Sequence, residues 1–476
     1  MAEDPKSFAD KGTGAHDSDE YDAERTDLHG RRHSRITLEE DSDSSMSVGK
    51  QIELEGNNAI KLLLYFSPSL IMTVVVAALV LYTSLVVWEF CLRHPEIRDV
   101  CDIGQMLYWN SKWAWWLTAV MFILNNTFIQ GLHVLTFAKY LNTMSSHGEC
   151  TVVFAVISAI ICFVFSLPRT FSTLAKLASA SAFFTFISVL LATIFAAVEP
   201  HPANYHADPN YIDPSTGTNY GGAPKVLAVP AAGTTFVAGM NAWLNISYTF
   251  IGQITIPSFI AEMKNPRDFP KALWAVTICE VILFSLVGAI IYAYTGTQYM
   301  TAPAFGSLGN VVYKKVSFSF MIPTLIFLGV LYASVSARFV FFRLFDNTRH
   351  KGNHTILGWG SWIGILAALW VLAFIIAEVI PFFSDLLSLM SSLFDCFFGF
   401  IFWGTAYLRM RRKDFGPSFY KSRGARGWIG FVFNWILIAI GFFMLGVGTY
   451  ASVDQIILDY ESGSVGGVFT CEDNGI

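Results

Sequence analysis

Ten long apolar runs follow one another along this chain of 476 residues and constrain its fold more than any other feature. Crossing about 30 Å of hydrocarbon takes roughly 20 residues of α-helix, and every run approaches or exceeds that length. The runs lack the two-residue alternation of a lipid-facing barrel strand, so helices are expected. They cover residues 69–90, 113–138, 150–167, 177–198, 234–259, 272–294, 316–337, 357–379, 382–407 and 428–453.

The composition excludes most other classes of protein. Hydrophobic residues make up 54% of the chain and charged residues only 14%, whereas about a quarter of a soluble domain is charged. A soluble domain has no interior large enough to bury so much apolar surface. The net charge of -5 offers no basic surface for nucleic acid. The sequence therefore predicts an all-α polytopic membrane protein with the lipid bilayer as its main partner.

The first 61 residues differ from the rest. They contain fifteen Asp and Glu and eight Lys and Arg, with few long apolar side chains, so they cannot bury enough surface to fold. They also lack the pattern of a signal peptide. We expect residues 1–61 to form a disordered acidic cytoplasmic tail, residues 62–453 a transmembrane transporter domain, and residues 454–476 a short C-terminal tail. Arg31-Arg32-His33-Ser34 fits a basophilic kinase site, and a solvated spacer is the simpler alternative.

The seven cysteines give no sign of a metal site. None belongs to a Cys-x-x-Cys pair or to a Cys/His cluster with zinc spacing. They lie singly at Cys91, Cys101, Cys150, Cys162, Cys279, Cys396 and Cys471.

The basic residues divide the loops into two groups. Loops after odd-numbered runs hold 19 Lys and Arg, and loops after even-numbered runs hold 4. Basic residues accumulate in cytoplasmic loops, so the odd-numbered loops are expected inside. The loop of residues 199–230 and the C-terminal tail are then outside. Cys150 and Cys471 share that oxidising side, where a disulfide could join them.

This orientation conflicts with the N-terminal tail. A single span separates the tail from the first inside loop, which would place the tail outside. An acidic tail without a signal peptide is, however, expected in the cytoplasm. One further span before residue 69 would remove the conflict. Lys61 and Glu89 enclose 27 uncharged residues, which is long for one crossing and short for two. The sequence therefore predicts that one helix is missing.

The fifth run is the most informative part of the chain. Gly239, Gly252 and Pro257, with Asn, Ser, Thr and Gln between them, make a poor continuous helix. A broken helix inside a membrane is tolerated where its free backbone groups meet a cavity, a ligand or an ion. The alternative is a kinked helix whose small residues allow close packing.

The segment after this run carries a family motif. Residues 257–272 read Pro-Ser-Phe-Ile-Ala-Glu-Met-Lys-Asn-Pro-Arg-Asp-Phe-Pro-Lys-Ala. This resembles the amino acid/auxin permease family, whose sixth helix ends in a Pro-x-x-x-x-x-Met-Lys-x-Pro run followed by Phe-Pro-Lys-Ala. The resemblance extends to residues 125–131, 381–389 and 407–409. It is closest to fungal permeases for neutral and aromatic amino acids.

The resemblance implies an inverted-repeat fold of the amino acid–polyamine–organocation type, with eleven helices. Residues 69–90 then correspond to the second helix and residues 234–259 to the sixth, so the missing span is the first. Helices one and six together form the substrate site of the family. The implied activity is ion-coupled symport of neutral amino acids, which could include aromatic ones, at the plasma membrane rather than the vacuole. The coupling ion would be H+ or Na+, and no other cofactor is implied.

Polar residues inside the runs are candidates for function, since they are costly in lipid. The candidates for substrate binding are Asn245, Thr249, Phe250, Gly252 and Gln253 on the fifth run, with Asn126 and Gln130 on the second. The candidates for ion coupling are Ser334, Ser336, Glu280 and Asp395. Interhelical hydrogen bonds or contacts with water are the alternative for each.

Two other classes of function compete with transport. The chain has no His-Glu-x-x-His, Gly-x-Ser-x-Gly or Walker motif, so neither a membrane enzyme nor a primary pump is expected. A non-transporting amino-acid sensor, or an inactive product of altered splicing or gene modelling, is the more serious alternative because one helix is predicted to be missing.

Overall fold

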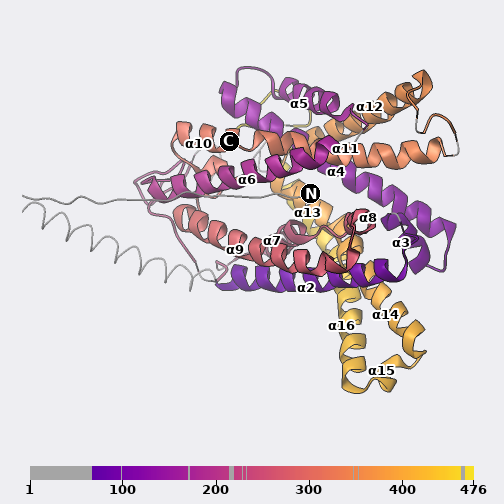
Figure 1. Ribbon diagram of the computed structural model, residues 1–476. Coiled ribbons are helices and arrows are strands. Elements are labelled where there is room, and N and C mark those ends of the chain that lie inside the picture. The colour runs from indigo at the N-terminus through magenta and orange to yellow at the C-terminus, as the bar shows by residue number, and fades with distance from the viewer. Residues whose placement is uncertain are drawn as a thin grey trace, which may run out of the picture. The chain divides into compact units, whose positions relative to one another are not determined.

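The computed structural model describes residues 67–476, apart from residues 98, 170–171, 214–218, 228, 232, 347, 352 and 462–466. This part of the chain is helical without a strand, and its two isolated β-bridges lie in one loop. The prediction of an all-α protein is confirmed (Figure 1). The predicted N-terminal tail and nearly all of the segment from Lys61 to Ser69, where a helix is predicted to be missing, lie outside the described residues.

The helices follow the predicted runs. Eight helical stretches of the described chain are long and apolar enough to cross a membrane. The other two predicted runs are α5 (Thr151–Ser166), which is shorter, and the fifth run, which is divided into α7 (Phe236–Phe250) and α8 (Ile256–Glu262). The eight stretches are formed by α2 (Ser67–Arg93), α4 (Lys112–Ser145), α6 (Ser172–Val198), α9 (Phe269–Thr295), α10 and α11 (Val311–Ser319, Ile322–Leu344), α12 (Ile356–Val379), α13, η3 and α14 (Phe383–Met390, Ser391–Ile401, Phe402–Phe415), and α16, η4 and α17 (Gly424–Phe443, Met444–Gly448, Thr449–Glu461).

Several helices continue past their predicted ends: α4 runs to Ser145, α11 to Leu344 and α14 to Phe415. The last stretch continues to Glu461, past the predicted end at residue 453, so the helix extends into the predicted C-terminal tail. A helix, α3 (Val100–Leu107), also lies within the predicted loop after the first run. Asp99 caps α3 by accepting hydrogen bonds from the N–H groups of Cys101 and Asp102, which satisfies two free donors at its start. Short helical turns complete the described chain at Pro266–Asp268 (η1), Ala304–Ser307 (η2) and Phe419–Ser422 (α15).

The core is built around α4, which packs against α3, α5, α11 and α12. Two buried tryptophans of α12 bind α5 and the residue after it. The Nε1–H of Trp370 donates to Ser166 Oγ, and that of Trp362 donates to the carbonyl of Leu167. Gly131 of α4 lies so close to α12 that a Cβ there would stand 3.0 Å from the Ala373 carbonyl. Small residues of this kind allow the close helix packing on which membrane proteins depend.

A second apolar group joins α7 to the last helices. Its buried members lie on α2, α7, η3, α16, η4 and α17, and they form a cluster separate from the core around α4. They are Val76, Val80, Met240, Leu244, Cys396, Phe400, Leu437, Met444 and Ala451. A third, smaller group joins Ala196, Ile291 and Leu308.

Ion pairs join the loops that are predicted to lie inside. Glu89 and Arg93 at the end of α2 form a closed ring with Arg411 and Asp414 of α14, at N–O distances of 2.5 to 3.4 Å. Arg343, which ends α11, binds Asp99 at 2.8 Å. Loops after the first, seventh and ninth runs thus meet at one end of the described domain, as the alternation of basic residues requires.

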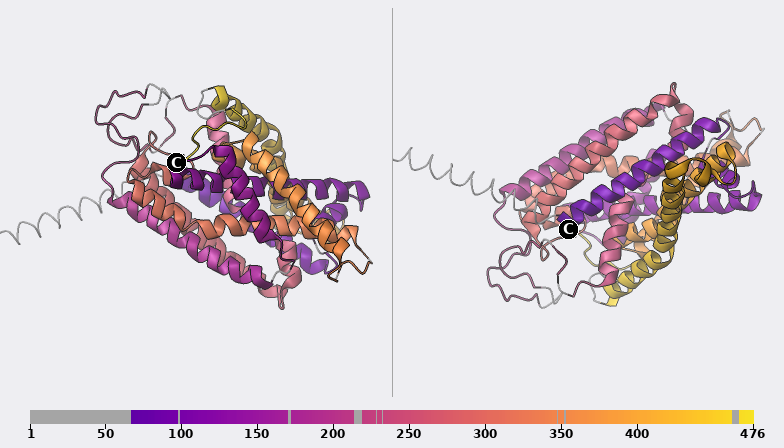
Figure 2. Two further views of the ribbon diagram at one scale, coloured as in Figure 1. Left: turned by 90° about the horizontal axis from the view of Figure 1, so that it is seen from above. Right: turned by 90° about the horizontal axis from the view of Figure 1, so that it is seen from below.

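The loops predicted to lie outside meet at the opposite end (Figure 2). Glu199, which follows α6, accepts hydrogen bonds from Tyr294 and from the N–H groups of Gly309 and Asn310. The described parts of the long loop of residues 199–230 are tied down as well, since the Tyr299 hydroxyl donates to the carbonyls of Tyr220 and Gly222.

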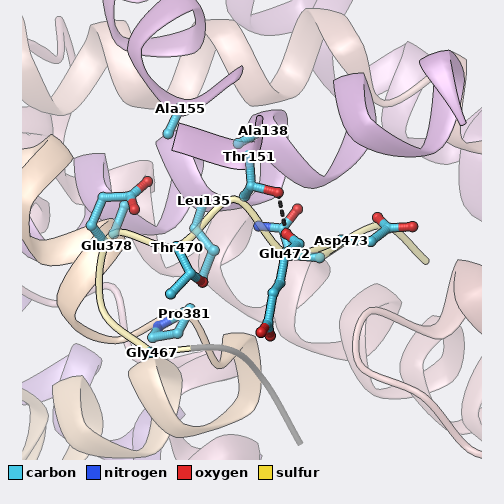
Figure 3. A pocket seen from close by; sticks show the side chains of 12 residues that line it. Leu135, Ala138, Thr151, Ala155, Glu378, Pro381, Gly467, Thr470, Glu472 and Asp473 are labelled. Carbon is cyan, nitrogen blue, oxygen red and sulfur yellow. Dashed lines mark hydrogen bonds between the residues drawn. The ribbon is translucent and has the colours of Figure 1, made fainter. Parts of the chain in front are cut away.

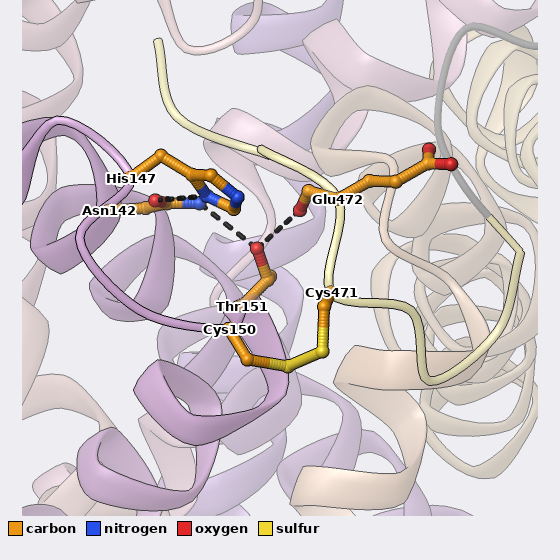
Figure 4. The surroundings of a disulfide bond; sticks show 6 residues. All are labelled: Asn142, His147, Cys150, Thr151, Cys471 and Glu472. Carbon is orange, nitrogen blue, oxygen red and sulfur yellow. Dashed lines mark hydrogen bonds between the residues drawn. A yellow bond between two sulfur atoms is a disulfide. The ribbon is translucent and has the colours of Figure 1, made fainter.

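A disulfide fastens the C-terminal segment at this end. Cys150, directly before α5, is bonded to Cys471 across 321 residues of sequence (Figure 4). Thr151 donates a hydrogen bond to the Glu472 carbonyl, and Asn142 donates to Asn474 Oδ1 at 3.0 Å. The sequence left this pairing open as a possibility. The structure contains it, and the bond places the C-terminal segment on the same side as the α4–α5 turn.

Candidate functional site

The fifth run is broken, as the first of its two interpretations predicts. Helix α7 ends at Phe250 and α8 begins at Ile256. The carbonyls of residues 248–250 would bond the N–H groups of residues 252–254 in a continuous helix, and the break releases them. Thr255 satisfies the Gly252 carbonyl with both its N–H and its hydroxyl group. Backbone polar groups are therefore available in the middle of an apolar region.

A cavity of about 200 Å³ lies against this break. Its wall combines residues from α4, α7, the break itself, α11 and η3. They are Asn125, Ile129, Tyr248, Thr249, Ile251, Ile254, Tyr332, Asp395 and Phe398. Pockets for drug-sized ligands measure roughly 300–1,000 Å³, so this cavity suits a smaller molecule.

A second cavity is too small for a substrate. It measures about 30 Å³ and lies under the C-terminal segment, where Glu378, Thr470 and Glu472 line it (Figure 3). A single water needs roughly 10–15 Å³ of such space. We therefore place the candidate site at the helix break.

Asp395 reaches the larger cavity from an unusual helix. The segment Ser391–Ile401 is a π-helix, and the residue after it still bonds five residues back, from the Phe402 N–H to the Phe397 carbonyl. π-Helical turns occur frequently at functional sites. Asp395 is only 7% exposed, and its Oδ2 has no hydrogen-bond partner within the described residues. A buried carboxylate of this kind needs a positive or hydrogen-bonding partner.

Of the residues of the fifth run predicted to bind substrate, Thr249 lines the cavity. Asn245 donates instead to Ser384 Oγ at 2.8 Å, and the Phe250 ring packs edge-on against Phe284 of α9. Gln253 is fully buried and donates to Thr83 of α2 at 2.9 Å. Gly252 lies in the break, and a Cβ there would meet nothing within 4 Å.

The candidates on α4 lie beside the cavity wall. Asn126 donates to Ser336 Oγ of α11 at 3.0 Å, and Gln130 donates to the Asn126 carbonyl. The side chains that line the cavity from this helix are Asn125 and Ile129. Adjacent residues of a helix point about 100° apart. Asn125 therefore faces the cavity, whereas Asn126 faces Ser336 of α11.

The four candidates for ion coupling are dispersed. Asp395 lines the cavity. Ser334 is buried and its hydroxyl finds no partner in the described chain, while Ser336 accepts the hydrogen bond from Asn126. Glu280 is half-buried on α9 and does not line the cavity. Their roles in binding an ion stay predictions, as do the roles of the substrate-binding candidates.

Seven of the nine residues that line the cavity are not among the predicted site residues, and two of the seven are tyrosines. These are Tyr248 of α7 and Tyr332 of α11. Tyr248 had a usable signal, because it lies within the broken run. Tyr332 had none, because a tyrosine in an apolar run is also typical of ordinary packing.

Bundles of membrane helices with a broken helix beside a cavity occur in transporters. Comparison with known proteins gives the family. Residues 66–454 match the family described as transmembrane amino acid transporter protein. The chain belongs to this family, which confirms the resemblance inferred from its motifs.

Named fungal proteins resemble the chain over most of its length. It is 29% identical over 408 residues to the N amino acid transport system protein of Neurospora crassa, covering 85% of this chain and 81% of the relative. It is 34% identical to a transmembrane transporter of Gibberella moniliformis and 31% identical to one of Fusarium pseudograminearum. Each of these two alignments covers 83% of this chain and 78% of the relative.

Proposed function

We propose that this protein carries neutral amino acids, aromatic ones included, across the plasma membrane by ion-coupled symport. The observation that carries the proposal is the buried cavity of about 200 Å³ at the break between α7 and α8. Membership of the family indicates that the substrates are amino acids. The cavity adds the chemistry that selects among amino acids.

The lining favours an uncharged side chain on the substrate. Its apolar part comes from Ile129, Ile251 and Ile254, and from Phe398. The rings of Phe398, Tyr248 and Tyr332 can pack against an aromatic or aliphatic substrate side chain. A second charge on the substrate would have to leave water without a matching partner, at a cost of several kcal/mol.

The coupling ion in this proposal is H+ or Na+. Asp395 lies in the cavity wall and could hold a proton there. Ser334 supports the sodium alternative, because its buried hydroxyl oxygen has no partner among the residues described, and sodium, like other hard cations, prefers oxygen ligands. Ser336 is occupied by Asn126, and Glu280 is remote from the cavity lining, so both are weaker candidates.

Uptake measurements test the proposal. The full-length protein would be reconstituted into sealed vesicles with imposed pH or sodium gradients, and uptake of labelled leucine, phenylalanine, lysine and glutamate would be followed. We expect saturable uptake of leucine and phenylalanine that only one of the two gradients drives. Protein-free vesicles are the control. Uptake restricted to lysine or glutamate, or uptake that neither gradient changes, would contradict the proposal.

A second candidate function is a sensor that binds amino acids without moving them, or an inactive product of such a transporter. The observation that favours it is the predicted missing span. An inverted repeat holds its ligand between two broken helices, and the residues between Lys61 and Ser69 are too few for a second spanning helix. Sequencing of transcripts tests the inactive alternative, which requires messages that encode about 40 further residues at this position. Leucine binding without uptake would favour the sensor.

A further inference from the structure

Two buried polar side chains line the cavity at the helix break. Asn125 is 5% exposed and Asp395 is 7% exposed, and both line the cavity. Oδ2 of Asp395 has no partner in the described part of the chain. The neighbouring Asn126 is committed to Ser336, whereas no hydrogen bond joins the Asn125 amide to any other described residue. The two side chains come from different helices, α4 and η3.

The charge of this site is incomplete. The wall contains one carboxyl group and no Lys, Arg or His, so nothing in the lining neutralises Asp395. An unpaired carboxylate in such a place costs several kcal/mol. The other polar groups of the wall, the Asn125 amide and the hydroxyls of Tyr248, Thr249 and Tyr332, carry no charge. A cation that enters with the ligand would supply the missing charge.

We propose that Asp395 binds the α-ammonium group of the substrate and that the Asn125 amide donates to its α-carboxylate. The inference rests on the proposed function and gives Asp395 a partner other than the coupled proton considered above. The ammonium of an amino acid carries one charge and three donors, which suits a lone carboxyl group. The carboxylate needs donors, and the amide of Asn125 supplies two. Ile129 and Phe398 then face the substrate side chain.

Three ligands of similar size separate these two contacts. Leucine has both groups, 3-methylbutylamine lacks the carboxylate, and 4-methylpentanoate lacks the ammonium. Their affinities would be measured by displacement of labelled leucine, or by direct calorimetry, on the full-length protein in lipid nanodiscs. We expect Asp395→Asn to weaken leucine and the amine by roughly 10- to 100-fold, as for a lost hydrogen bond to a charged group. The acid should not be weakened, because the variant removes a carboxylate that repels it. Asn125→Ala should weaken leucine and the acid and spare the amine.

Two further variants test whether a loss of affinity comes from a change in the fold and not from the lost contact. Glu378→Gln removes a carboxyl group that is equally buried, at 8% exposure, but lies outside this cavity, and it should leave all three affinities unchanged. Asp395→Glu keeps the charge and should recover part of the affinity for leucine.

The outcomes distinguish this inference from the proposed function. Leucine binding that Asp395→Asn does not change, or an equal loss for all three ligands, would overturn the inference and leave the proposed function intact. The inference also fails if Asp395→Asn keeps its affinity for leucine but loses the drive of a pH gradient, which would assign Asp395 to coupling. A wild-type protein that binds no amino acid would count against both.

Discussion

Breaking the Cys150–Cys471 disulfide by Cys471→Ser should lower the stability of the folded protein measurably. The bond closes a loop of 321 residues, and loop-closure entropy for a freely unfolded chain of that length amounts to about 5–6 kcal/mol. Helices that stay inserted restrict the unfolded chain in a membrane or micelle, so we expect a smaller effect of about 2–4 kcal/mol. Noncovalent contacts of the C-terminal segment, such as Asn142 with Asn474, remain available to the variant.

Thermal unfolding of the purified protein in detergent measures this effect. With unfolding entropies that scale with chain length, a loss of 2–4 kcal/mol corresponds to a midpoint lowered by about 2–5 °C. Reductant should bring the wild-type midpoint to that of the variant and leave the variant unchanged. Cys279→Ser, at an exposed free cysteine, is the matched control and should have no effect. The reasoning fails if the oxidised wild type and Cys471→Ser unfold at the same temperature, or if alkylation finds seven free thiols in the native protein.

Three further predictions concern the site and the topology. Gly252→Leu should abolish uptake with a normal amount of protein at the surface, whereas Gly239→Leu on the same run should not. A Cβ meets nothing within 4 Å at either glycine, so the first side-chain carbon fits at both positions. Unchanged uptake in Gly252→Leu would remove that residue from the site. An epitope tag after Ile476 should be labelled on intact cells, and labelling only after permeabilisation would reverse the orientation derived from the basic residues. Insertion of a family-type first helix of about 40 residues between Lys61 and Ser69 should raise uptake strongly. A second broken helix adds hydrogen bonds to the charged ends of the substrate, each worth roughly 1.5–3 kcal/mol. Equal uptake by the unmodified chain would refute the idea that a helix is missing.

The helices could be predicted from the sequence because each run forms its backbone hydrogen bonds within itself and can span the bilayer independently. The break at Phe250 was also predictable in outline, since Gly252 and Pro257 weaken a helix wherever it packs. The odd-numbered loops meet at one end because successive spanning helices cross the membrane in opposite directions. The ion pair of Arg343 with Asp99 shows this, as it joins loops 244 residues apart.

The cavity itself could not be predicted, because it depends on how separate helices are rotated about their axes. Nothing local decides whether Asn125 or Asn126 faces it. The π-helix that carries Asp395 is a further case, and it packs against α16 and η4, which lie later in the chain. Tyr332 enters the site only because α11 packs on α4.

The ring of charges between α2 and α14 also has a consequence for the order in which the protein is made. Arg93 leaves the ribosome 321 residues before its partner Asp414, and Glu89 leaves it 322 residues before Arg411. At about 5–20 residues per second, the partners follow roughly 15–65 s later. The earliest described helix therefore stays in the membrane for most of synthesis with its charged end paired only within itself, through Glu89 and Arg93. A nascent chain halted before α14 would lack the ion pairs of Arg93 with Asp414 and of Glu89 with Arg411.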